Sequence, residues 1–134
     1  MKSPRTILTL ALLLGHLGAA RAQAPAQQPP EAPAYDPYHA EKSIEVGRYY
    51  LKRGNYDAAI ERFEEALRYK PNFARAYHLL GEAYEKKGDK AQAVKAYQKY
   101  LEIVPSAEDA GKVRKRIDKL SRDLKRAAAR RRSG

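Results

Sequence analysis

VGRYYLKRGNYDAAIERFEEALRYKP, residues 46–71, is followed at residues 80–105 by LGEAYEKKGDKAQAVKAYQKYLEIVP. The second stretch repeats the side-chain pattern of the first with a period of 34 residues. The recurring pairs are Gly47 and Gly81, Tyr50 and Tyr84, Gly54 and Gly88, Ala59 and Ala93, Phe63 and Tyr97, and Pro71 and Pro105. A fixed period of this length indicates stacked helical units, which bind other molecules through a shaped surface. The sequence therefore predicts an all-α fold.

Capping and stop signals divide the chain after residue 35 into five expected helices. The first begins at Asp36-Pro37 and runs to about Lys52, and the second covers residues 55–69. Asn72 is the expected cap of a third helix that runs to residue 87, and Asp89 caps a fourth that ends before residue 105. Ser106 with Asp109 resembles a capping box, which predicts the start of a fifth helix there.

The repeated residues have physical roles in this interpretation. Gly47 and Gly81 lie inside helices, where Gly costs about 1 kcal/mol relative to Ala, so close helix approach is the expected compensation. Ala59 and Ala93 are predicted at the facing tight contacts. The aromatic residues of both units fill the wider gaps, and the prolines stop the second helix of each unit.

These residues resemble the tetratricopeptide repeat family, whose pattern has Leu-Gly and Tyr in one helix, then Ala, an aromatic residue and a final Pro. The resemblance implies two helix-turn-helix units, residues 40–73 and 74–107, within a segment spanning 38–107. A third unit does not continue the pattern, because Gly111 and Arg114-Lys115 stand where the large residue and Leu-Gly are needed. The fifth helix is therefore expected to cap a short α-solenoid fragment. Its small size implies marginal stability, self-association or docking on a partner.

In this family the first helices of successive units line a concave groove. The resemblance therefore implies a partner-binding surface that is suited to an extended peptide or helix with apolar and charged groups. Its expected residues are Glu41, Ile44, Arg48, Leu51, Lys52, Arg75, His78, Glu82, Glu85 and Lys86. An ordinary solvated helix face is the alternative interpretation.

The N-terminal segment has the pattern of a secretory signal peptide. Lys2 and Arg5 precede an apolar run at residues 7–17, and small residues around Arg21 suit a cleavage site, so residues 1–24 are assigned to the signal. An uncleaved membrane anchor is the alternative. The following Pro/Ala/Gln-rich residues 25–37 are interpreted as a disordered linker. We therefore expect an exported protein, periplasmic or secreted.

Positive charge concentrates at the C-terminus. Residues 112–134 contain 11 Lys and Arg against 2 Asp and Glu, whereas residues 23–111 contain 13 against 14. Residues 108–134 are thus predicted to form a basic capping helix and tail. A solvated outer face explains this charge, and the alternative is a surface for anionic lipid or another polyanion. Nucleic acid is the less favoured target, because no aromatic residue follows Tyr100 to stack on bases.

Other function classes find little support in the sequence. The chain has no Cys, so disulfides and thiolate metal sites are excluded. His39 and His78 stand alone rather than at metal-ligand spacing, and the Ser residues lack a nucleophile context. We predict a non-enzymatic protein-interaction module without metal or cofactor, whose protein partner the sequence does not identify.

Overall fold

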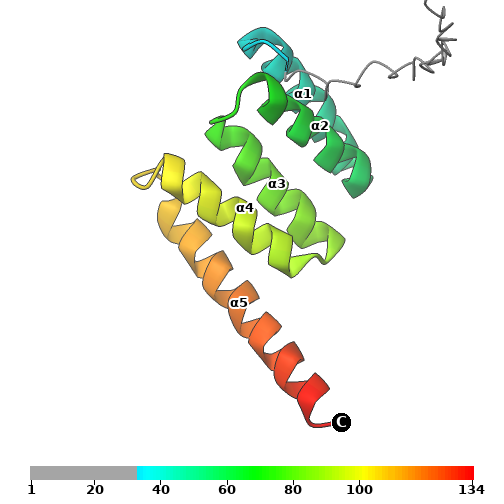
Figure 1. Cartoon of the computed structure of the whole chain (residues 1–134), viewed down its shortest axis with the longest axis vertical. Coiled ribbons are helices and arrows are strands. Elements are labelled where there is room, and N and C mark those ends of the chain that lie inside the picture. Colours follow the sequence, from blue (N-terminus) through cyan, green and yellow to red (C-terminus); the bar gives the residue numbers. More distant parts are fainter. Residues whose placement is uncertain (1–32) are drawn as a thin grey trace, which may run out of the picture. The chain divides into compact units, whose positions relative to one another are not determined.

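The structure, a computed structural model, describes residues 33–134. They form five α-helices: α1 (Pro37–Lys52), α2 (Tyr56–Tyr69), α3 (Ala74–Lys87), α4 (Lys90–Ile103) and α5 (Ala110–Arg132). Each helix packs on the next along the chain, and α1 also contacts α3 (Figure 1). Within this part of the chain the helices form two hairpins, α1–α2 and α3–α4, followed by α5. This confirms the predicted all-α fold of two helical units and a capping helix.

Local capping chemistry explains most helix boundaries. The side chains of Asp36, Asn55 and Asp89 each accept a hydrogen bond from the backbone amide three residues later. Gly54 and Gly88 have positive φ angles of 75° and 91°, which Gly adopts without a Cβ penalty at helix ends. Asp36 and Pro37 therefore belong to the start of α1 rather than to the predicted linker, most of which lies with the signal segment outside the described residues.

Two predicted helix starts are wrong. The N-cap of α3 is Phe73 rather than Asn72, and no side chain caps its amides. The Phe73 ring is buried in the core, which fixes the turn by packing instead. Helix α5 begins at Ala110, so Ser106 lies in the preceding turn, and the carboxylate of the N-cap residue Asp109 makes no capping bond.

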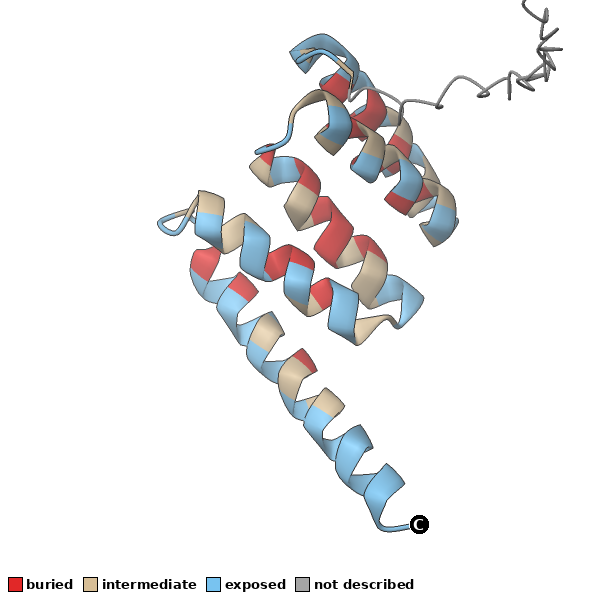
Figure 2. Cartoon of the chain, in the orientation of Figure 1, coloured by how far each residue is buried: buried red, intermediate tan, exposed pale blue. Residues whose placement is uncertain are grey.

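The core runs between the helices of each hairpin and between neighbouring hairpins (Figure 2). Phe63 and Tyr97 are fully buried and lie against Gly47 and Gly81, respectively. A Cβ at either glycine would meet these rings first, so the glycines make room for the aromatic residues. The prediction that Ala59 and Ala93 face the glycines is therefore wrong. Both alanines are nevertheless fully buried.

Helix α5 covers the apolar face of α4. Val113 and Leu120 are buried in a cluster with Ala93 and Tyr97, and Ile117 packs against it. Lys90 Nζ donates to Asp123 Oδ2 at 2.8 Å, which ties the two helices together near the start of α4. From residue 125 onward every residue of the helix is exposed, so α5 continues beyond its contact with α4 (Figures 1 and 2). None of the helices within residues 33–134 is long and apolar enough to cross a membrane.

Candidate functional site

A hollow of about 400 Å³ lies between α1 and α3, where the predicted groove should be. The buried side chain of Leu79 and the half-buried Leu51 provide apolar surface, and charged side chains surround them. The hollow is lined by Arg48, Leu51, Lys52, Arg75, His78, Leu79, Glu82 and Lys86. Seven of the ten predicted groove residues therefore come together on one surface.

The three other predicted residues lie elsewhere. Ile44 is fully buried in the hydrophobic core, because its side chain packs under α2 and α3 rather than toward the groove. Glu85 Oε2 accepts a hydrogen bond from the Tyr97 hydroxyl at 2.9 Å and lies 3.7 Å from Arg116 Nη1, so it serves the α3–α5 contact. Glu41 does not line the hollow, but its Oε2 accepts from Arg75 Nη1 at 3.0 Å.

The groove carries an excess of positive charge. Arg75 is neutralised by Glu41, and Glu82 lies 3.7 Å from Arg116 of α5. Among the described residues no carboxylate lies within 4.0 Å of the side-chain nitrogens of Arg48, Lys52 or Lys86, so these three cations keep their charge uncompensated. The groove therefore offers apolar contacts together with a net positive potential.

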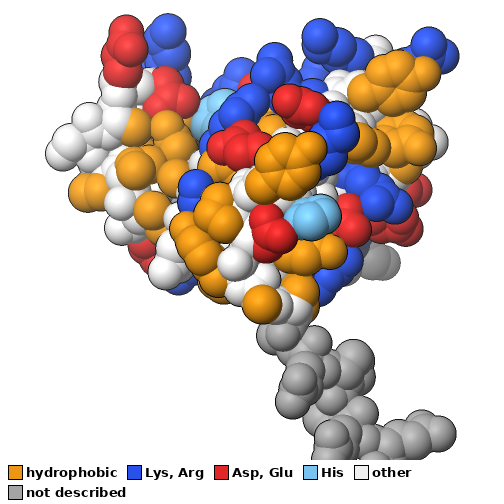
Figure 3. Space-filling model, turned by 90° about the horizontal axis from the view of Figure 1, so that it is seen from above, with side chains coloured by type: hydrophobic (Ala, Val, Ile, Leu, Met, Phe, Trp, Pro, Cys, Tyr) orange, Lys and Arg blue, Asp and Glu red, His pale blue; other side chains and the backbone are white. Residues whose placement is uncertain are grey.

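A second hollow of about 600 Å³ adjoins the groove, because both include Arg75 and His78. It lies between α3, the end of α4 and the turn into α5. Its lining is mostly apolar and consists of Ala74, Arg75, His78, Tyr100, Val104, Pro105, Ser106, Ala107 and Asp109. This hollow can take a large apolar side chain at one end of the groove. The face of the molecule in Figure 3 mixes basic, acidic and hydrophobic side chains, and no single type dominates it.

Asp109 organises the wall of this second hollow. Its Oδ1 accepts a hydrogen bond from the Tyr100 hydroxyl at 2.6 Å, and its Oδ2 lies 3.2 Å from His78 Nε2. The His78 ring also packs edge-on against Tyr100, with centroids 5.0 Å apart. The carboxylate thus joins α3, α4 and α5, which explains why it does not cap the helix that it precedes.

Three tyrosines have perturbed acidity. Burial, with Glu64 nearby, raises the pKa of Tyr84 to about 12, and burial with the Asp109 hydrogen bond raises the pKa of Tyr100 to about 12. Burial and the Glu85 hydrogen bond also raise the pKa of Tyr97. These hydroxyls remain protonated donors at neutral pH, so they act as structural links rather than as acid–base groups. Within residues 33–134 no three His, Asp or Glu side chains gather in an arrangement that could hold a metal ion.

Sequence reasoning missed the second hollow. Tyr100 departs from the repeat pattern at the position of Ala66, and this departure was the one available signal. In the structure Tyr100 packs against the cluster of Val113 and Leu120. The positions of Val104 and Ala107 depend on the late start of α5, which no local pattern revealed.

Comparison with known proteins agrees with this architecture. Residues 46–108, just under half of the chain, match the model of the tetratricopeptide repeat family. The resemblance inferred from the sequence is thus confirmed over this segment.

Similarity to other proteins is more distant. One similar solved structure is described as the first TPR of Spaghetti (RPAP3) bound to the HSP90 peptide SRMEEVD; it is 21% identical, with a TM-score of 0.35, and the match covers 66% of this chain and 95% of that one. No curated protein matches the chain significantly.

Proposed function

We propose that the protein is a non-enzymatic adaptor whose groove between α1 and α3 binds an acidic segment of a partner protein. The observation that carries this proposal is the set of uncompensated cations, Arg48, Lys52 and Lys86, around an apolar floor. Carboxylates of a bound segment would form ion pairs with these cations. Leu51 and Leu79 would contact an apolar side chain of the same segment. Charge complementarity of this kind favours both selectivity and fast association.

The adjoining hollow gives the bound segment a direction. It is large enough for an aromatic or long aliphatic side chain, and its mouth is bounded by Arg75 and His78, which also line the groove. The segment that fits best therefore has one large apolar residue at the α5 end and acidic residues along α1 and α3. The groove is lined by helical residues alone, so it is formed before the partner arrives. The adjoining hollow also includes residues of the turn between α4 and α5.

Selection of peptides from a displayed random library on the purified chain tests this proposal. Peptides with clustered Asp and Glu next to a large apolar residue should be enriched. The variant Arg48→Gln/Lys52→Gln/Lys86→Gln should bind such peptides at least tenfold more weakly, whereas Arg68→Gln/Lys95→Gln/Lys99→Gln, with the same charge change on α2 and α4, should bind them normally. Enrichment without acidic residues, or equal losses in both variants, would contradict the proposal.

We further propose that the adaptor acts outside the cytoplasm, in the periplasm or as a secreted protein. The support is the signal-peptide pattern of residues 1–24. N-terminal sequencing of the protein isolated from its own cells tests this: a start near residues 23–25 agrees with export, and an intact Met1 contradicts cleavage.

A further inference from the structure

The outer side of α5 carries a regular row of cations. Lys112, Lys115, Lys119, Arg122, Arg126 and Arg130 follow one another at spacings of three and four residues, so they lie on one face of the helix. We call these six residues the basic ridge. With a rise of about 1.5 Å per residue, the ridge is about 27 Å long. All six side chains are exposed.

The ridge makes no ion pair within the described part of the chain, although the charge of Asp123 interacts with Lys119 and Arg126. The acidic residues of α5 are Asp118 and Asp123, and the carboxylate of Asp123 pairs with Lys90 of α4 at 2.8 Å. No residue of the ridge has a carboxylate within 4.0 Å among residues 33–134; Arg116, which does, points toward Glu82 and Glu85 instead. Like charges at these spacings destabilise a helix, so the ridge lowers the stability of α5.

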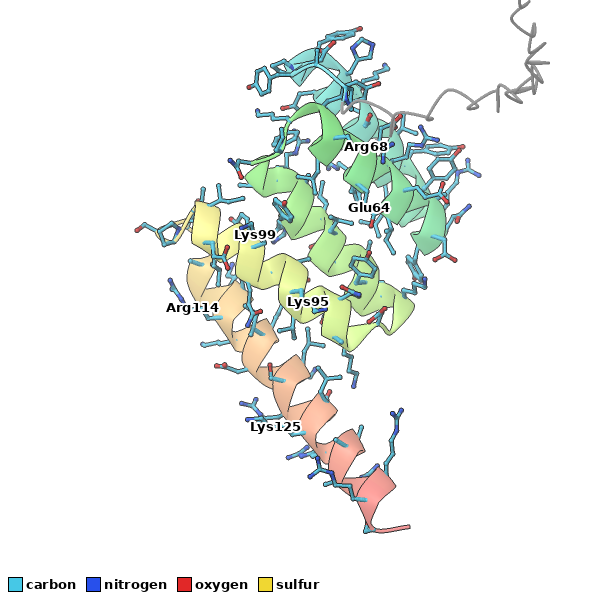
Figure 4. All side chains as sticks on the ribbon, in the orientation of Figure 1. Glu64, Arg68, Lys95, Lys99, Arg114 and Lys125 are labelled. Carbon is cyan, nitrogen blue, oxygen red and sulfur yellow. The ribbon has the colours of Figure 1, made fainter. Side chains whose placement is uncertain are left out.

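The surroundings of the ridge indicate a flat, rather than a narrow, target. Lys125 extends from the side of α5 away from α4 and widens the positive face (Figure 4). Arg114 instead donates from Nη2 to the carbonyl oxygen of Pro105 at 2.9 Å. The hollow that reaches α5 contains only its N-cap residue, Asp109, so the ridge itself stands on open surface. The apolar residues Val113 and Leu120 are buried against α4 and are not available for insertion.

We propose that the basic ridge docks the protein on a membrane surface rich in anionic lipid headgroups. The contact is electrostatic and peripheral, because α5 buries its apolar stripe in the protein and presents only cations to the lipid. A nucleic-acid target fits less well, since no aromatic residue follows Tyr100. This inference does not depend on the groove, which lies between other helices.

Sedimentation with lipid vesicles tests the proposal. All variants are prepared with the same N-terminus. The purified chain should bind vesicles that contain phosphatidylglycerol and should not bind vesicles of phosphatidylcholine alone. Binding should vanish between 0.1 M and 1 M salt, as the Debye length falls from about 10 Å to about 3 Å. Lys119→Gln/Arg122→Gln/Arg126→Gln should bind about a hundredfold more weakly, because each cation near such a surface contributes about a fivefold factor.

The matched control is Arg68→Gln/Lys95→Gln/Lys99→Gln, which removes three positive charges from α2 and α4 (Figure 4). Its vesicle binding should fall by less than threefold, and circular dichroism should show unchanged helix content in both variants. Equal losses in the two variants would show that net charge alone matters and would overturn the proposal. Binding to phosphatidylcholine, or binding to a DNA duplex but to no vesicle, would also overturn it.

Discussion

Gly81 and Gly47 give the sharpest test of how the two repeat units pack. A Cβ on Gly81 would overlap the ring of Tyr97, whose Cζ would lie only 2.8 Å away. Tyr97 is fully buried, and its hydroxyl is held by Glu85 and Arg116, both at 2.9 Å. Displacement of the ring away from Gly81 would therefore strain these bonds and the packing around the ring. Overpacking at such a site costs up to about 3 kcal/mol.

Gly81→Ala also brings a gain, because Ala is better than Gly inside a helix by about 1 kcal/mol. The net expectation is a destabilisation of about 2 kcal/mol. For a folded region of this size that corresponds to a fall in Tm of about 10 °C, measured by circular dichroism at 222 nm. Gly47→Ala should cost less, since the facing Phe63 ring has no hydroxyl to anchor it.

Gly111→Ala is the matched control. Gly111 lies in the first turn of α5, and a Cβ there would meet nothing within 4 Å. Only the helix-propensity term remains, so this variant should be as stable as the original chain or more stable by up to about 1 kcal/mol. The reasoning is refuted if Gly81→Ala melts at or above the original temperature, or if Gly111→Ala is the most damaging of the three.

Three further predictions follow from the contacts of α5 and the tyrosines. Leu120→Ala should lower the free energy of unfolding by about 2–3 kcal/mol in urea titrations, because it opens a cavity between α4 and α5, whereas the exposed Ala128→Ser should change it by less than about 0.5 kcal/mol. A chain that ends after Leu124 should melt within about 2 °C of the full chain, since residues 125–134 are exposed; a large fall would show that the overhang is structural. In ultraviolet titration, Tyr84 and Tyr100 should ionise near pH 12 rather than near pH 10, and Tyr100→Phe should remove one of these late ionisations.

The sign of the last effect on stability follows from linkage. The folded state holds the proton of Tyr100 more tightly than the unfolded state, because the pKa rises on folding. This contribution to stability is therefore complete below pH 10 and is lost as the pH rises toward about 12. At a fixed urea concentration, the unfolded fraction should therefore rise as the pH increases from 10 toward about 12. This rise should be smaller in Tyr100→Phe.

Much of the fold could be predicted because the same side-chain pattern occurs in both repeat units. The pairs Gly47/Gly81 and Pro71/Pro105 fixed the helix pattern, and the side-chain caps at Asp36, Asn55 and Asp89 act as expected. The partner of Gly81 was misassigned to Ala93, because a one-dimensional pattern shows which residues are small but not which large ring fills the space beside them.

The candidate site could be predicted less completely. Ile44 and Glu85 were placed in the groove by their position in the repeat, yet one packs in the core and the other binds Tyr97. Helical position defines a face only to within about one turn, so residues at its edges can point either way. The hollow beside Asp109 depends on contacts between three helices, and the departure of Tyr100 from the repeat pattern was its one local signal.

The central claim, that the groove between α1 and α3 binds an acidic segment, is tested most directly by amide chemical shifts. An ¹⁵N-labelled chain is titrated with an acidic peptide that carries one large apolar residue. The control is a charge-reversed peptide in which Lys replaces each acidic residue. The account predicts saturable shifts at Arg48, Lys52, His78 and Lys86, with little change at Arg68 and Lys95 on the opposite helices. Shifts confined to α2, α4 or α5, or equal shifts with the basic peptide, would contradict it.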